Sequence, residues 1–288
     1  MPYLYLTVSV FMCASTSIFG KGYNRRCDGF RGASAFYNLL QMIAVLASWG
    51  VIFATSPSFE PAVLPYSLGF AACYTVCNIA VIYALKHGPA SLTSLFVSLA
   101  LILTSIWGLI FWDAKATPAV IIGLILVVAA IYLCLYSGKK EEKAVSLKWV
   151  FFALLAMAGN AGCSIVQRSQ QMAFDGQHGN MLMLFASLGS AITCSVIFAL
   201  GEKRDAPSLA ARGWFFPALA GLCNVILNVF VIKLASTDLS PSLIYPTIGV
   251  GGLVVVILFS LLVYKEKLTP FQWAGIAVGT VATLLLSL

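Results

Sequence analysis

Long apolar stretches separated by short polar segments run along the whole chain. A helix needs about 20 apolar residues to cross the hydrocarbon core of a bilayer, and segments of this length recur from one end to the other. Open strands cannot satisfy their backbone groups in lipid, and the segments lack the alternation of barrel strands, so we expect helices. The first stretch has no basic residues before it, which favours a permanent span over a cleaved signal. The ten predicted spans cover residues 2–21, 32–55, 63–85, 88–112, 117–137, 147–168, 179–200, 212–234, 239–264 and 269–288.

The composition agrees with a location in a membrane. Hydrophobic residues make up 60% of the chain and charged residues 9%, with a mean hydropathy of +0.95, whereas roughly 25% of residues are charged in soluble domains. We therefore expect a multi-pass protein surrounded by the lipid bilayer of a cell membrane, such as the bacterial inner or plasma membrane. The net charge of +7 is spread over short loops. No basic helix carries it, so no nucleic-acid partner is expected.

The apolar pattern occurs twice. Pro65, Pro89 and Pro118 each have a counterpart 152 residues later, and KATPAVIIG (115–123) aligns with KLTPFQWAG (267–275) at the same offset without a gap. We interpret the chain as a tandem duplication, with repeats at 1–137 and 147–288 joined by a charged loop at 138–146. Each repeat has five spans, an odd number, so the second repeat must be inserted upside down relative to the first. Inverted repeats of this kind are typical of transporters.

Basic residues are divided unevenly between the two sides of the predicted membrane. If successive loops alternate sides, 14 of the 17 Lys and Arg residues fall on one side, and only Lys115, Arg168 and Lys233 fall on the other. The positive-inside rule then places the loops between spans 1–2, 3–4, 5–6, 7–8 and 9–10 in the cytoplasm. Both termini would lie outside.

Charged and metal-binding chemistry is missing from the middle of the predicted spans. All ten acidic residues fall in loops or at span ends. Ionisable groups at the midplane mark proton relays or ion sites, so we expect no coupling through a membrane carboxylate and no anionic substrate. The eight cysteines form no C-x-x-C pair, and the sequence contains neither H-E-x-x-H nor G-x-S-x-G. We therefore expect no catalytic residue, no metal site and no cofactor.

Neutral polar side chains remain inside the spans. Such residues either contact a substrate or join helices by hydrogen bonds, and both interpretations stay open for each of them. Asparagine is the stronger candidate because an amide has four hydrogen-bonding positions to satisfy. Span 239–264 also contains Tyr245-Pro246 and several glycines, which indicate either a local break that lines a cavity or a plain packing kink, and both interpretations stay open. The candidate substrate-binding residues are Tyr74, Asn78, Ser94, Ser98, Asn160, Ser164, Asn224, Asn228 and Tyr245.

Three motifs resemble a known family. YALKHGPASLTSL (83–95) with WDAKATPAVIIGLILVVAAIYL (112–133), and LVYKEKLTPFQWAGIAVGTVATLLL (262–286), are similar to the two copies of the EamA-type domain of the drug/metabolite transporter superfamily. The resemblance covers essentially the whole chain. It implies an all-α membrane fold of ten helices in two inverted five-helix repeats, with a central cavity lined by spans 1, 3, 4, 6, 8 and 9. It also implies cytoplasmic termini, contrary to the charge count, and only Glu266 matches the family's usual acidic position.

The resemblance also implies a function. Similar proteins move amino acids, other small metabolites or toxic compounds, often outward. We therefore expect a transporter, not an enzyme, that exports a small uncharged or zwitterionic, amino-acid-like metabolite by alternating access, as a monomer or a homodimer. Two alternatives stay open. One is a multidrug or toxic-compound efflux carrier, which normally needs a membrane carboxylate, and the other is a non-transporting membrane subunit.

Overall fold

The described part of the chain is a bundle of helices. The computed structural model describes residues 2–112, 117–136, 146–201, 205–235 and 241–286, without the side chains of 235, 241–243, 245 and 246. These residues form helices and turns and no strand, which confirms the predicted all-α class. The helices are α1 (Pro2–Arg26), α2 (Ala33–Thr55), η1 (Pro61–Val63), α3 (Leu64–His87), α4 (Ala90–Ser98), α5 (Leu101–Phe111), α6 (Pro118–Leu135), α7 (Leu147–Ala173), α8 (Gly179–Leu200), α9 (Ala206–Gly213), α10 (Phe215–Ala235), α11 (Pro241–Leu262) and α12 (Pro270–Leu286).

Most of these elements are long and apolar enough to cross a bilayer. Eight helical segments meet both criteria, counting η1 with α3 and α4 with α5. Two shorter apolar helices, Thr247–Leu262 and Pro270–Leu286, follow them near the end of the chain. The chain is therefore a multi-pass membrane protein.

The repeated prolines begin helices, which explains their fixed spacing. Pro118 and Pro270 are the first residues of α6 and α12, where a missing backbone N–H costs nothing. The threonine before each proline supplies the cap. Thr117 Oγ1 accepts a hydrogen bond from the backbone N–H of Val120 at 3.3 Å. Thr269 and Gln272 cap each other's backbone N–H groups at 3.2 and 3.0 Å, forming a capping box.

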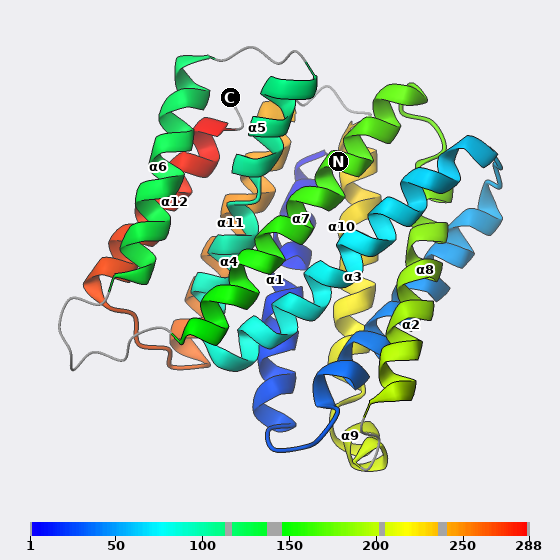
Figure 1. Ribbon diagram of the computed structural model, residues 1–288, viewed down its shortest axis with the longest axis horizontal. Coiled ribbons are helices and arrows are strands. Elements are labelled where there is room, and N and C mark those ends of the chain that lie inside the picture. The colour runs from blue at the N-terminus through cyan, green and yellow to red at the C-terminus, as the bar shows by residue number, and fades with distance from the viewer. Residues whose placement is uncertain (1, 113–116, 137–145, 202–204, 236–240, 287–288) are drawn as a thin grey trace.

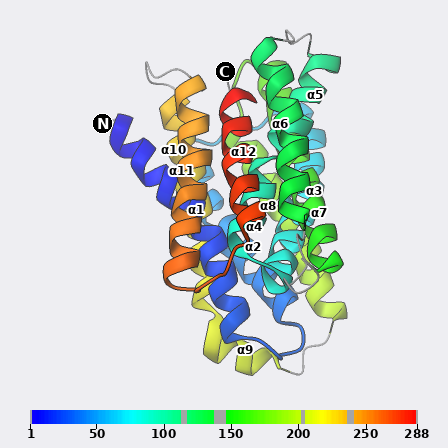
Figure 2. The same cartoon turned by 90° about the vertical axis from the view of Figure 1, so that its left-hand side faces the viewer.

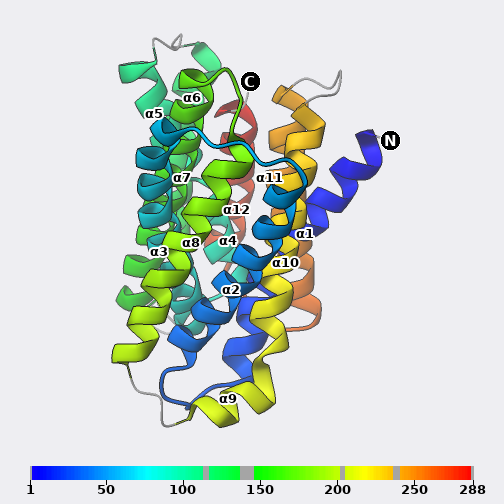
Figure 3. The same cartoon turned by 90° about the vertical axis from the view of Figure 1, so that its right-hand side faces the viewer.

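The helices pack in a regular set of partnerships. Helix α3 lies against α7 and α8, and α10 lies against α1 and α2. Helices α6 and α12 pair along one edge of the bundle (Figure 1 and Figure 2). Both termini lie at one end of the molecule and the short helix α9 lies at the opposite end (Figure 3). Helices α6 and α12 correspond to spans 5 and 10, which are not among the spans expected to line the central cavity.

The contact between α6 and α12 uses equivalent positions of the two predicted repeats. A Cβ atom at Gly123 would lie 2.9 Å from Leu286 Cγ, and one at Gly275 would lie 2.5 Å from Cys134 Sγ. Gly123 and Gly275 are 152 residues apart, and so are Cys134 and Leu286. The Gly123–Leu286 and Gly275–Cys134 contacts are therefore related by the same 152-residue offset as the prolines. Gly279, the second glycine of the Gly-x-x-x-Gly motif in α12, faces Leu95 of the same chain, so this motif packs internally.

Two glycines bring α7 into close contact with α3. A Cβ atom at Gly159 would lie 2.9 Å from the Cα, Cβ and backbone N atoms of Cys77. A Cβ atom at Gly162 would lie 2.6 Å from the Sγ atom of Cys73. Because the backbone of Cys77 cannot rotate away as a side chain can, glycine is the residue that fits at 159. The closeness of these two helices depends on it.

One predicted span is broken and another is not. Span 88–112 divides into α4 and α5 at Leu99 and Ala100, where Val97 O accepts hydrogen bonds from Ala100 N at 3.3 Å and from Asn160 Nδ2 at 3.0 Å. In span 239–264 a local break near Tyr245 was one of two interpretations, and it is wrong because α11 runs uninterrupted from Pro241 to Leu262. Span 212–234 begins later than expected, because the eight-residue helix α9 precedes α10.

The loop between α1 and α2 offers a test of membrane orientation. Its native Cys27 is only 2% exposed, and burial raises the pKa of its thiol, so it will not react with a maleimide. Asp28 and Ser56, near opposite ends of α2, are exposed. From the charge count we expect a membrane-impermeant maleimide to label Ser56→Cys in intact cells, and Asp28→Cys only after permeabilisation. The unsubstituted chain measures labelling of the native cysteines. The reverse pattern would place both termini in the cytoplasm.

Candidate functional site

Polar side chains of α2, α3 and α10 meet inside the bundle. Tyr74 donates its hydroxyl hydrogen to Asn224 Oδ1 at 2.9 Å, and Gln41 Nε2 donates to Asn78 Oδ1 at 3.2 Å. Asn228 Nδ2 donates to the backbone oxygen of Asn224 at 2.8 Å and to its Oδ1 at 3.3 Å. We refer to Gln41, Tyr74, Asn78, Asn224 and Asn228 as the amide cluster. Its Tyr74–Asn224 bond joins α3 of the first predicted repeat to α10 of the second.

The amide cluster lies near the middle of its helices. Tyr74 and Asn78 lie within Leu64–His87, Gln41 within Ala33–Thr55, and Asn224 within Phe215–Ala235. Water is scarce at this depth, so each amide must find its partners in the protein or in a bound solute. All five side chains are uncharged and offer both donors and acceptors. Such a group suits a neutral or zwitterionic solute better than a singly charged one.

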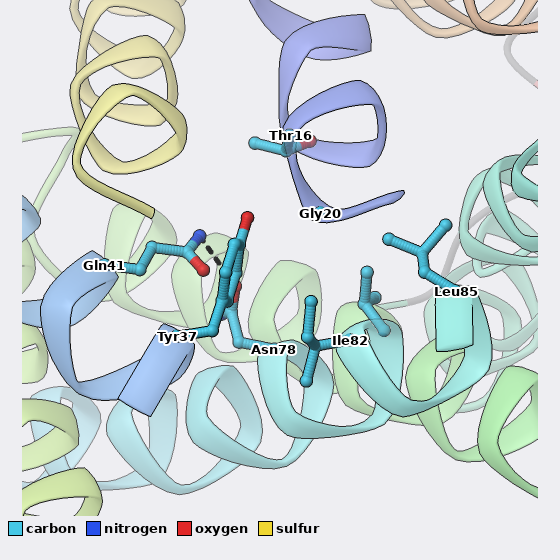
Figure 4. Close-up of a pocket in the computed structure, with 8 residues that line it drawn as sticks. Thr16, Gly20, Tyr37, Gln41, Asn78, Ile82 and Leu85 are labelled. Atoms are coloured by element: carbon cyan, nitrogen blue, oxygen red, sulfur yellow. Dashed lines mark hydrogen bonds between the residues drawn. The ribbon is translucent and has the colours of Figure 1, made fainter. Parts of the chain in front are cut away.

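A small cavity lies directly beside the amide cluster. It lies between α1, α2 and α3, where Gln41 and Asn78 face it together with Tyr37, Thr16 and Gly20 (Figure 4). Its volume of about 20 Å³ is enough for one water molecule or little more. Organic ligands occupy sites of about 300 Å³ or more. The helices must therefore separate here before a solute can reach the amides.

A second polar group joins α1, α4 and α7. Ser94 Oγ donates to Ser17 Oγ at 2.8 Å, linking α4 to α1. Asn160 Nδ2 donates to the backbone oxygen of Val97, as described above, and links α7 to the break after α4. Ser98 and Ser164 instead donate to backbone oxygens of their own helices, at 3.0 and 3.1 Å. This group stabilises the irregular backbone between α4 and α5. Few of its polar hydrogens are left without a hydrogen-bond acceptor.

The predicted site residues thus fall into two groups. Tyr74, Asn78, Asn224 and Asn228 come together in the amide cluster, while Ser94, Ser98, Asn160 and Ser164 lie around the α4–α5 break. The side chain of Tyr245 lies outside the described residues. Gln41 and Tyr37 were missed. Gln41 carried the same signal as the asparagines, an amide inside an apolar span, and is only 3% exposed.

Glu266 lies at the end of the bundle opposite the termini. Its carboxylate accepts hydrogen bonds from Ala90 N at 2.8 Å and from Ser91 Oγ at 2.9 Å, at the start of α4. Lys21 Nζ of α1 lies 3.8 Å from the same carboxylate. The carboxylate is thus held at a helix end by α1 and α4. Within the described residues, the hydrogen bonds of this carboxylate reach the start of α4 and not the amide cluster.

Comparisons with known proteins agree with this architecture. The model of the EamA-like transporter family matches residues 1–136. No curated protein sequence matches the chain. Among 27 matching chains of solved structure, one crystal structure of a protein aligns over 99% of this chain and 95% of its own length, with a TM-score of 0.64 and 12% sequence identity. At that identity the likeness concerns the fold alone.

Proposed function

Because residues 1–136 match the model of the EamA-like transporter family, we propose that this chain is a transporter of that kind and that it carries a small uncharged or zwitterionic organic metabolite, similar in size to an amino acid. The solute crosses the membrane by alternating access and moves outward. The family accounts for transport as such. The class of solute, the direction and the mechanism are our proposal, and the amide cluster is the observation that supports them.

The chemistry of the amide cluster favours this class of solute. Asn78, Asn224, Asn228 and Gln41 offer amide donors and acceptors, and Tyr74 adds a hydroxyl, so both the acidic and the amino group of a zwitterion can be bound. A singly charged solute would need an opposite charge at this depth. Thr16 and Tyr37 contribute further hydroxyls to the adjoining cavity. Opening the cavity between α1, α2 and α3 would expose these groups to one side of the membrane.

We further propose ten spans arranged as two inverted repeats, at 1–137 and 147–288, linked by 138–146. The partnerships of the helices support this arrangement: α10 packs on α1 as α3 packs on α7, and α2 packs on α10 as α8 packs on α3. If α1, α2 and α3 are exchanged with α7, α8 and α10, respectively, the α10–α1 contact becomes the α3–α7 contact. The same exchange turns the α2–α10 contact into the α8–α3 contact. Helix α1 leads away from the end that holds the termini, whereas α7 leads toward it (Figure 1). The reciprocal Gly123 and Gly275 contacts fit the same exchange.

Transport by the purified protein tests the proposed function. Amino acids and other small neutral metabolites are first screened for a rise in melting temperature, and any stabilising solute is then measured in a counterflow assay in liposomes. We expect at least one such solute to exchange across the membrane faster than in protein-free liposomes. Exchange of lipophilic cations, with none of the neutral solutes, would instead favour a toxic-compound carrier. A protein that moves nothing from either panel would contradict the proposal.

A further inference from the structure

A large pocket lies at the end of the molecule that contains Glu266. It measures about 710 Å³ and is formed by the ends of α1 and α3, the start of α12 and the turn between α11 and α12. In the described part of the chain, five Lys or Arg residues line it, together with His87: Lys21, Arg25, Lys86, Lys265 and Lys267. Lys21, Arg25 and Lys86 come from the first predicted repeat, and Lys265 and Lys267 from the second. The pocket is distinct from the amide cluster, and none of their residues is shared.

Among the described residues, the positive charge of this pocket is only partly balanced. Of the described acidic residues, Glu266 alone lines it, and its carboxylate is already bound to the start of α4 and lies beside Lys21. Within the described part of the chain, no carboxylate lies within ion-pair distance of Lys86, Lys265 or Lys267. These three lysines are exposed to solvent, and positive charges gathered around one cavity attract anions to it.

Membrane insertion alone does not explain this convergence. The positive-inside rule requires basic residues on one side of the membrane, and not around a common cavity. Other cations of this end are placed differently. Arg26 lies over the ring of Phe215 at 5.8 Å, and Arg212 lies over the ring of Phe30 at 5.2 Å. Two cations of the pocket are held in place as well: Arg25 lies 4.7 Å from the centre of the Tyr264 ring and donates to Tyr264 O, and Lys21 Nζ donates to Leu85 O and Gly88 O. Within the described residues, Lys86, Lys265 and Lys267 have no comparable arrangement.

The backbone at Lys265 adds a second observation. Its φ angle is +52°, in the left-handed region that favours glycine or asparagine. A lysine is therefore held in the turn against the preference of its backbone. Glu266 N donates to Ser260 O at 3.0 Å and fixes this turn on the end of α11. The strained turn places one lysine on each side of Glu266 among the residues that line the pocket.

We propose that this pocket binds the phosphate group of an anionic ligand. Phosphate offers several acceptor oxygens to ammonium and guanidinium donors, and charge-assisted hydrogen bonds of this kind are the strong ones. The volume lies within the range of about 300 to 1,000 Å³ that small organic ligands occupy, so the phosphate belongs to a larger molecule. An anionic phospholipid headgroup and a soluble phosphorylated metabolite share this chemistry. Either ligand would contact basic residues of both predicted repeats at this end of the bundle.

Binding to the purified protein tests this proposal without measuring transport. The probes are inorganic phosphate, compared with chloride at equal ionic strength, and short-chain phosphatidylglycerol, compared with phosphatidylcholine. Binding is followed by native mass spectrometry and by the melting temperature. The double variant Lys265→Gln/Lys267→Gln removes two charges from the pocket. The control Arg168→Gln/Lys233→Gln removes two charges near the ends of α7 and α10 that lie away from it.

We expect the Lys265→Gln/Lys267→Gln variant to bind the phosphate-bearing probes roughly tenfold or more weakly, and the control to bind them as the parent does. Binding of phosphatidylglycerol alone would identify the ligand as a lipid headgroup. Binding of inorganic phosphate as well would identify a soluble phosphate compound. The proposal is overturned if neither probe binds, if phosphatidylcholine binds equally well, or if all three proteins bind alike. None of these results bears on whether the amide cluster carries a solute.

Discussion

Asn224→Ala is expected to lower the rate of solute exchange by roughly five- to a hundredfold, equivalent to about 1 to 3 kcal/mol. The substitution removes an amide that would contact the solute, and it also removes the acceptor of the Tyr74 hydroxyl, which lies 2.9 Å away. The initial rate of counterflow in liposomes measures the loss. Asn180→Ala serves as a matched control, because that amide lies at the start of α8 and bonds only weakly, at 3.4 Å, to Ser56.

A double variant separates binding from packing. Tyr74→Phe/Asn224→Ala removes both members of the hydrogen bond and leaves no hydroxyl without a partner, so its melting temperature should recover toward that of the parent. Its transport should stay low if the amides contact the solute. If transport recovers together with stability, or if Asn224→Ala and Asn78→Ala both transport like the parent, the amides only hold the helices together.

Gly159→Ala is expected to destabilise the protein by about 1 to 3 kcal/mol, although it adds a single methyl group. That methyl carbon would lie 2.9 Å from backbone atoms of Cys77, so α3 and α7 would have to move apart. The matched control is Gly50→Ala in α2, where a Cβ atom meets nothing within 4 Å. There the substitution should stabilise the helix by about 0.5 to 1 kcal/mol. Melting in detergent, followed by size-exclusion chromatography, measures both changes. Equal melting temperatures for the two variants would contradict the close α3–α7 contact.

The sequence predicted the helices well because their signals are local. Long apolar runs define the spans, and the Thr-Pro pairs at 117–118 and 269–270 mark where α6 and α12 begin, since one residue caps the helix and the next fits its first position. The break after α4 gave no such signal. Leu99 and Ala100 are good helix formers, and the break is visible only in the contact between Val97 and Asn160 of another helix. The proline of span 239–264 suggested a break that the structure does not have.

The types of residue in the candidate site could be predicted from the sequence better than the individual residues that come together. An amide inside an apolar span is costly, so Asn78, Asn224 and Asn228 could be selected from the sequence. Which amides meet depends on how α2, α3 and α10 are rotated against each other, and one sequence does not specify that rotation. Gln41, which contacts Asn78 directly, carried the same signal as the asparagines and was not selected. Ser98 and Ser164 were selected, yet their hydroxyls bond to their own helices.

The break between α4 and α5 implies that the two halves differ in stiffness. When TSIFGK (16–21) is aligned with CSIVQR (163–168), Asn160 corresponds to Cys13 of α1. Asn160 supplies a hydrogen bond to the carbonyl at the break. Cys13 lies against Gly252 of the uninterrupted α11, and a thiol is a poor substitute for an amide donor. A break in α11 would leave a carbonyl unpaired in hydrocarbon. Under the proposed carrier function, the first half therefore bends in the middle of a span, whereas the corresponding helix of the second half moves as a rod.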